Sequence, residues 1–327
     1  MLTNQPNYHL RPNKSIDRNL FGQTLLGLSR LYPISEYCYT GFGSYLFDDF
    51  KLYHETLNIS KMISLEKDSD AYARADFNKP YGCIVLKNQN STDYLSELVI
   101  EEETNNIFWL DFVSPGELGV QLSDYATLLN MLNPHDVVRI TLNANPDSLG
   151  KCSDPSQIQT VRLEELRNRV QDKYLPHDLS ENDVTRPRYP LTLLKILKAI
   201  TIECLDDRPP YSPNFLFPLF STVYADGQQM LTFTGIVLDS HDDEALIRDV
   251  LKEYGHNTFS WDQVSRIEIP ALSVREIAEI NKLLPSENAQ QQLMEKFPFI
   301  FSAKDQQSAD SYIAYYKHYP NYHQVSF

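Results

Sequence analysis

The chain has 327 residues and a formal net charge of −15. This charge argues against non-specific binding to duplex nucleic acid, because such affinity comes largely from lysine and arginine at phosphates. The four cysteines are scattered singly, without the close spacing of a zinc site, which predicts reduced thiols in a cytoplasmic protein. The N-terminal segment lacks an apolar core, and no run of about 18 apolar residues occurs, so we expect neither a signal peptide nor a membrane span.

Short apolar segments alternate with helical patterns through the first 146 residues. We predict strands at 36–40, 61–65, 83–87, 107–112 and 136–142, and helices at 20–31, 45–57, 68–77, 91–98 and 118–132. Asp17 is the predicted N-cap of the first helix. This alternation indicates βαβ units and a mostly parallel α/β sheet with helices on both faces. Ligands of such sheets bind beyond the carboxyl ends of the strands.

The second half of the chain is organised differently. Residues 147–214 are rich in proline and charge, and we interpret them as an insertion with helices at 162–173 and 191–204 that packs over the sheet as a lid. Two apolar runs, 215–224 and 230–238, flank Asp226-Gly227, which predicts an antiparallel hairpin. Further helices are predicted at 245–254, 274–284, 289–296 and 310–319, the last with a tyrosine stripe that docks as an aromatic face.

The order of these segments favours one Rossmann-like arrangement. Five parallel units followed by an antiparallel hairpin is the strand order of the class I S-adenosylmethionine (SAM) methyltransferases, whereas a dehydrogenase sheet continues parallel. The chain then divides into a core at 1–146, a helical insertion at 147–214, a terminal hairpin at 215–242 that completes the sheet, and a helical C-terminal region at 243–327.

Two features predict a nucleoside site. Gly41-Phe42-Gly43-Ser44 follows the first strand, where glycine lets the backbone turn tightly and approach a ligand, and Ser44 could cap the next helix or donate to a carboxylate. A glycine pair also occurs in tight turns that bind nothing. Glu66 ends the second strand, and a carboxylate there can accept hydrogen bonds from both ribose hydroxyls. The alternative for Glu66 is a solvated strand end.

The remaining candidates stand at later strand ends. Asn90 and Asp93 follow the third strand and would lie near an adenine, although both are also good helix caps. Asp111 ends the fourth strand and is the candidate catalytic residue, as a base or an acceptor ligand. With Asn143 and Asn145 it could bind a divalent cation, but one carboxylate and two amides are a thin ligand set, so we assign no metal.

Several stretches carry a resemblance to a known family. LFGQTLLGLSRL, YCYTGFGSYLFDDFKLYHETLNISKMISLEKD, IFWLDF, RITLNAN and the tail YIAYYKHYPNYHQ are similar to a group of prokaryotic O-methyltransferases within the class I superfamily. The resemblance implies a SAM-type Rossmann fold with SAM as cofactor, an unassigned acceptor and a link to antiphage defence. Two departures stand out. Ser44-Tyr45 replaces the usual third glycine, and Asp111-Phe112 stands where base methyltransferases have an Asn-Pro-Pro-Tyr-type motif.

Three functions remain open at this point. The first is methyl transfer to oxygen or nitrogen of an unidentified acceptor. The second is a catalytically inactive nucleotide-sensing or scaffold subunit whose aromatic-rich C-terminal region docks a protein partner. The third is an NAD-dependent oxidoreductase, against which the missing third glycine and the terminal hairpin both count.

Overall fold

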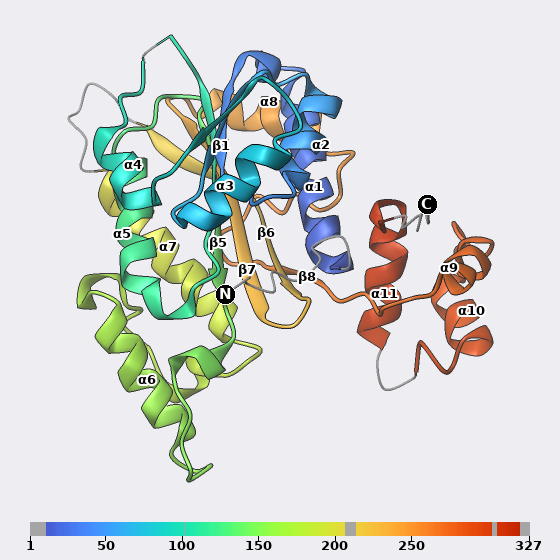
Figure 1. The fold of residues 1–327 in the computed structure, drawn as a ribbon. Helices are drawn as coiled ribbons and strands as arrows, with labels where there is room; N and C mark the ends of the chain where they lie inside the picture. The colour runs from blue at the N-terminus through green and yellow to red at the C-terminus, as the bar shows by residue number, and fades with distance from the viewer. Residues whose placement is uncertain (1–10, 102, 207–213, 303–305, 321–327) are drawn as a thin grey trace. The chain divides into compact units, whose positions relative to one another are not determined.

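The computed structural model describes residues 11–101, 103–206, 214–302 and 306–320. Its centre is an eight-stranded sheet with the order β3-β2-β1-β4-β5-β7-β6-β8 (Figure 1). The chain forms two compact units, one of residues 22–223 and 228–265 and the other of residues 1–21, 224–227 and 266–327. We describe each unit by itself.

Five parallel strands form one side of the sheet, as predicted. They are β1 (Cys38–Gly41), β2 (Lys61–Leu65), β3 (Ile84–Lys87), β4 (Asn106–Asp111) and β5 (Val137–Asn143). The pairs β3·β2, β2·β1, β1·β4 and β4·β5 are all parallel, so the carboxyl ends of these strands share one edge of the sheet. Strands β2 and β3 lie on one side of β1, and β4 and β5 lie on its other side, so the strand order reverses at β1. Sheets of this kind bind their ligands at such a reversal point.

The antiparallel hairpin is also present. It consists of β6 (Phe215–Ala225) and β7 (Gln229–Leu238), and β7 pairs antiparallel with β5. Gly227 adopts a φ of 113° in the turn, a conformation that L side chains rarely reach. The short strand β8 (Ser265–Ile267) follows β6 in the sheet order, and no periodicity in so short a segment predicted it.

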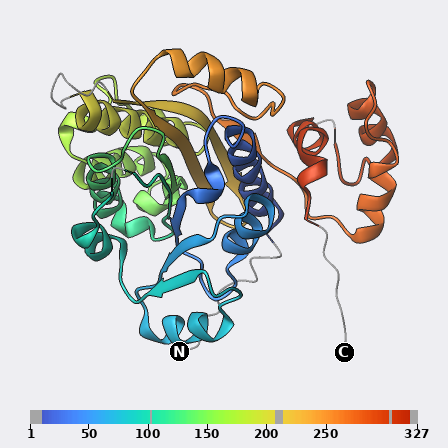
Figure 2. The same cartoon turned by 90° about the horizontal axis from the view of Figure 1, so that it is seen from above.

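Helices cover both faces of the sheet in the larger unit (Figure 2). The buried side chains of β4 and β5 form one core with those of α4 (Ser91–Glu97), α5 (Leu118–Leu129), α6 (Ile158–Arg169) and α7 (Tyr189–Asp206). On the opposite face lie α2 (Asp48–Leu57), α8 (Asp242–Leu251) and residues 22–28 of α1 (Pro12–Leu28), and α3 (Ser69–Asn78) follows β2. Gly27 of α1 leaves no room for a side chain, because a Cβ there would lie 2.4 Å from Leu251 of α8.

The start of helix α1 differs from the prediction. Helix α1 begins at Pro12, so Asp17 lies buried inside it and is not its N-cap. The carboxylate of Asp226 occupies that role, since it accepts hydrogen bonds from the backbone nitrogens of Asn13 (3.3 Å) and Lys14 (2.8 Å). Sequence periodicity could not find a cap that is supplied by a hairpin turn more than 200 residues away.

The predicted insertion contributes a helix to the core. The Tyr125 hydroxyl of α5 hydrogen-bonds to Thr201 of α7 at 2.9 Å, and α7 packs over the sheet beside α5. Helix α6 precedes it, and residues 207–213 lie outside the described residues. A lid role for this segment stays a prediction.

The C-terminal segment adds three helices, α9 (Val274–Asn281), α10 (Ala289–Lys296) and α11 (Gln306–Tyr315). The ring of Tyr312 is fully buried and packs between Phe301 and Tyr319, at centroid distances of 6.0 and 5.9 Å. The tyrosine-rich helix therefore docks its aromatic face within its own unit, as the stripe predicts. Across the described residues, every helix is too short or too polar to cross a bilayer.

Candidate functional site

The predicted site residues meet at the carboxyl edge of the parallel strands. Gly41 pairs in register with Ser64, two residues before Glu66, so the glycine turn and Glu66 follow adjacent strands. Asp111 is the last residue of β4, which flanks β1 on its other side. The structure thus brings Gly41–Ser44, Glu66 and Asp111 to one edge.

The glycine turn is shaped by side chains packed beneath it. A Cβ on Gly41 would lie 2.9 Å from the Tyr39 hydroxyl, and one on Gly43 would lie 2.7 Å from Phe47. The Gly43 nitrogen donates a hydrogen bond to the Ser64 hydroxyl at 3.1 Å, which ties the turn to β2. Both glycines are therefore required by packing on the inner side of the turn, independently of any ligand on its outer side.

The next residues of the turn correct the predicted helix start at Tyr45. Ser44 and Phe47 have positive φ values of 47° and 52°, so the chain turns twice before α2 begins at Asp48. The Ser44 hydroxyl accepts a hydrogen bond from the Leu46 nitrogen at 3.3 Å, and caps this turn rather than the helix. A serine in the left-handed conformation occupies the place where related loops have a third glycine.

Phe42 points away from the turn. Its ring lies 5.7 Å from that of Phe112, and it packs against the core on the α5 and α7 side of the sheet. A contact of Phe42 with the cofactor stays a prediction, and its backbone is the part that the turn presents.

Glu66 is half-buried immediately after β2. Burial raises the pKa of its carboxyl group, while the backbone N–H of Asp68, which donates to Oε1 at 3.1 Å, opposes the rise. The Glu66 carbonyl accepts a hydrogen bond from the side chain of Asn88 at 2.8 Å, so the loop after β3 is fixed to it. The hydrogen bond from the Asp68 nitrogen involves Oε1, so the Glu66 carboxylate keeps acceptor capacity for a pair of hydroxyl groups.

Asn90 and Asp93 have the helix-capping role that the sequence left open. Asn90 is the N-cap of α4 and accepts a hydrogen bond from the Asp93 nitrogen at 2.8 Å. Its amide nitrogen donates to the Asp93 carboxylate, also at 2.8 Å. An adenine contact by either residue stays a prediction.

A buried phenol and carboxylate lie beneath the turn, and the sequence analysis missed them. Tyr39 is fully buried and its hydroxyl donates to the Asp49 carboxylate at 2.5 Å. Register places Tyr39, Gly41 and Asp111 on the same face of the sheet, because Tyr39 pairs with Ile107 and side chains alternate. Burial, then the charges of Asp49 and Asp111, raise the pKa of Tyr39 well above its ordinary value.

One sequence signal could have found Asp49. It lies on the same helix face as Phe50, Tyr53 and Leu57, which are all buried. A carboxylate on the apolar face of an amphipathic helix requires a partner, so it marks a polar contact in the core.

The two asparagines after β5 are engaged by their own loop. Asn143 accepts a hydrogen bond from the Asn145 nitrogen at 3.0 Å, and Asn145 caps the next turn by accepting from Asp147 at 3.2 Å. The Asn145 amide also donates to Gln228 at 2.7 Å. These contacts explain both residues as turn formers.

The strand order, with an antiparallel seventh strand inserted beside β5, defines the class of protein: an α/β chain with the class I methyltransferase arrangement. A family model described as "Putative O-methyltransferase" matches residues 6–327. The chain belongs to this family. Comparison with curated proteins finds no significant match.

Solved structures of methyltransferases are similar to the chain at low identity. Trm1 from Pyrococcus horikoshii, with S-adenosyl-L-methionine, is 11% identical with a TM-score of 0.45, over 72% of this chain and 58% of Trm1, less than two thirds of its length. A "putative O-methyltransferase" from Klebsiella pneumoniae is 12% identical with a TM-score of 0.35, over 72% of this chain and 92% of its own. TYW2 from P. horikoshii, in complex with MeSAdo, is 11% identical with a TM-score of 0.34, over 66% of this chain and 62% of the TYW2 chain.

Proposed function

We propose that the chain is a SAM-dependent methyltransferase that acts on an oxygen or nitrogen of its acceptor. The observation that carries this proposal is the register of β1 and β2, which puts the Gly41 turn and Glu66 side by side at the reversal point of the sheet. Family membership supports the same chemistry. SAM supplies an activated methyl group on a sulfonium cation.

Each residue at this edge has a role that follows from its chemistry. Glu66 accepts hydrogen bonds from the two ribose hydroxyls, because an ionised carboxylate is an acceptor only. The outer backbone of Gly41–Ser44 contacts the methionine part, since its inner side is filled by Tyr39 and Phe47. These contacts fix the position of the methyl group, and positioning is the main contribution an enzyme makes to a direct displacement.

Asp111 is the residue we assign to the acceptor. It stands on the same sheet face as Tyr39 and Gly41, so a nucleophile held there approaches the methyl group from the β4 side. As the methyl group bonds to the acceptor oxygen or nitrogen, the bond to sulfur breaks, and Asp111 takes the proton that the acceptor loses. Tyr39 and Asp49 act beneath this pair by holding the turn and the first turn of α2 in place.

Calorimetry with SAM and its demethylated product tests the binding step. We expect Glu66→Gln to weaken binding of both nucleosides about tenfold or more, because it removes an ionised acceptor. Glu36→Gln is the matched control, since Glu36 is exposed and precedes the opposite end of β1. Absence of heat and of a thermal shift at millimolar SAM would overturn the proposal.

The inactive-scaffold alternative makes a different prediction. Nucleoside binding without transfer to any acceptor in a cell extract, followed with methyl-labelled SAM, would favour it, as would obligate copurification of a protein partner with the C-terminal region. An Asp111→Asn variant that binds SAM normally but has lost transfer would favour the enzyme. Binding of NAD in place of SAM would instead indicate the oxidoreductase.

Location and context remain inferences from the residues. The four cysteines are free thiols in the structure, which supports a reducing compartment such as the cytoplasm. A prokaryotic source and a link to antiphage defence are what the sequence resemblance implies, and both stay predictions.

A further inference from the structure

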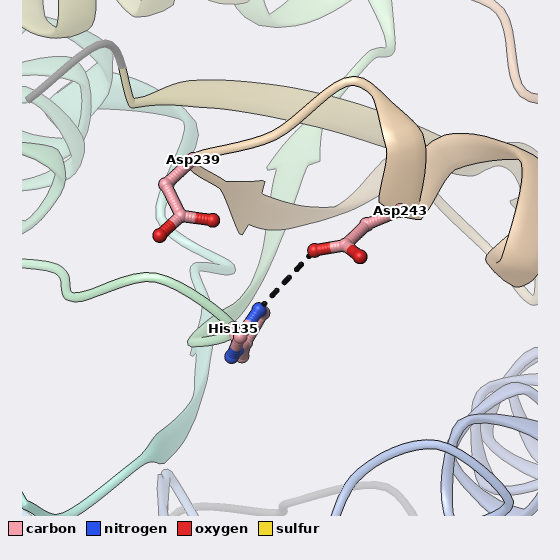
Figure 3. A group of neighbouring side chains, drawn as sticks. All are labelled: His135, Asp239 and Asp243. Carbon is pink, nitrogen blue, oxygen red and sulfur yellow. Dashed lines mark ion pairs between the residues drawn. The ribbon is translucent and has the colours of Figure 1, made fainter.

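A second cluster of ligating side chains lies at the opposite edge of the sheet (Figure 3). His135 precedes β5, Asp239 follows β7, and Asp243 is in the first turn of α8. One ring nitrogen of His135 and one oxygen of each carboxylate all lie within 4.8 Å of one another. This edge holds the amino ends of the parallel strands, so the cluster is separate from Gly41 and Glu66.

The backbone and a neighbouring ring fix the histidine. His135 has a φ of 72°, and its nitrogen donates to the Val237 carbonyl at 2.7 Å. The ring of Tyr32 stacks on the imidazole at a centroid distance of 4.5 Å and an angle of 29°. The imidazole is therefore held between Tyr32 and the two aspartates before any ligand binds.

The distance between His135 and Asp243 matches an ion-bridged pair. His135 Nε2 and the Asp243 carboxylate are 3.5 Å apart, which exceeds the 2.7–3.2 Å of an ordinary N–H···O hydrogen bond. Bonds of about 2.0–2.2 Å to a tetrahedral cation place neighbouring donor atoms roughly 3.4 Å apart. Figure 3 shows that the side chain of Asp239 borders the space between His135 and Asp243.

The cluster carries excess negative charge. Within the part of the chain that the structure describes, no lysine or arginine forms an ion pair with Asp239 or Asp243. Among the described residues, the cation that can pair with Asp243 is His135, which is charged only when its imidazole is protonated.

We propose that His135, Asp239 and Asp243 bind one divalent first-row transition-metal ion of the zinc type, with solvent completing its coordination. An imidazole nitrogen favours such an ion over Mg²⁺ or Ca²⁺, which prefer oxygen ligands alone. The ion joins the start of β5 to the connection between β7 and α8 and thereby stabilises the antiparallel pair. It takes no part in methyl transfer, and the proposal is independent of the proposed function.

Thermal unfolding of the full chain, stripped with a chelator, tests the site. We expect Zn²⁺ at a hundredfold excess over its dissociation constant to raise Tm by about 5 °C and Mg²⁺ to leave it unchanged. Asp239→Asn and Asp243→Asn should each weaken Zn²⁺ binding at least tenfold. Asp249→Asn is the matched control, because Asp249 is exposed on the same helix as Asp243 and pairs with Lys252.

Spectroscopy with Co²⁺ distinguishes this cluster from other ligands. Co²⁺ on His135 and the aspartates gives visible d–d bands without the near-ultraviolet charge-transfer band of a cobalt–thiolate bond. Such a charge-transfer band would assign the metal to a cysteine and overturn the proposal. The proposal is also overturned if wild type shows no Zn²⁺-dependent shift or if the shift persists in the double aspartate variant. It is overturned as well if the shift disappears in His241→Gln, which removes the exposed pair with Glu244 and the ring stacking on Phe215 but leaves the three proposed ligands in place.

Discussion

Replacement of Gly43 by alanine tests the packing beneath the proposed cofactor turn. A Cβ there would lie 2.7 Å from a ring carbon of Phe47 and 2.9 Å from both Phe50 and the Ser64 hydroxyl. Ordinary contacts begin near 3.4 Å, so each of the three neighbours must move by about half an ångström or more. Overpacking of this kind costs about 1–3 kcal/mol. Since each kcal/mol corresponds to roughly 2–4 °C in a large domain, we expect Tm to fall by about 2–12 °C.

The same substitution tests the proposed nucleoside site, because the turn must move to accommodate the added Cβ. We expect Gly43→Ala to weaken SAM binding by roughly ten- to a hundredfold, because displacements below 1 Å at a binding backbone are costly. Gly82→Ala is the control, since a Cβ at Gly82 meets no atom within 4 Å. Differential scanning calorimetry and titration with SAM measure the two effects. Wild-type stability in Gly43→Ala would refute the packing geometry, and wild-type SAM affinity in a destabilised variant would refute the location of the site.

Four further substitutions test other features of the fold. Tyr39→Phe removes the donor to Asp49, and we expect a loss of about 1–3 kcal/mol of unfolding free energy in urea. Asp136 has a pKa raised to about 6 by burial, so its folded form holds its proton more tightly than the unfolded chain. The free energy of unfolding of wild type relative to Asp136→Asn should therefore be highest near pH 4 and fall by on the order of 3 kcal/mol towards pH 7; a flat difference would contradict the shift. Ser44→Val places a β-branched residue at a φ of 47° and should cost about 1–2 kcal/mol, whereas Ser44→Gly should be near neutral; equal stability of the two variants in thermal melts would rule out strain at this position.

Much of the sheet could be predicted from hydrophobic runs and turn residues. The segment 61–65 matches β2 at both ends, because it is flanked by Asn58 and Glu66, and the Asp226-Gly227 turn located the hairpin. The start of α1 could not be predicted, since its cap is a carboxylate distant in sequence. The start of α2 was missed because Ser44 and Phe47 adopt left-handed conformations that neither residue type favours.

The candidate site could also be predicted only in part from the sequence. Gly41, Glu66 and Asp111 could be placed because strand ends are visible in the sequence and parallel strands bring them to one edge. The pair of Tyr39 and Asp49 could not, because its formation depends on which face of α2 meets the sheet. The proposed metal cluster could not be found from the sequence, because His135 lies about 100 positions before the two aspartates and meets them only through the pairing of β5 with β7.

Under the proposed function, the buried carboxylate of Asp49 and the half-buried one of Asp111 give a reason for a cationic cofactor to bind at this edge. Asp49 and Asp111 both contribute to the raised pKa of Tyr39, so the phenol lies in an anionic surrounding of low polarity. In such a surrounding a nearby positive charge is stabilised far more than in water. The sulfonium of SAM carries that charge and its demethylated product does not, so the proposed site would favour entry of the cofactor and release of the product.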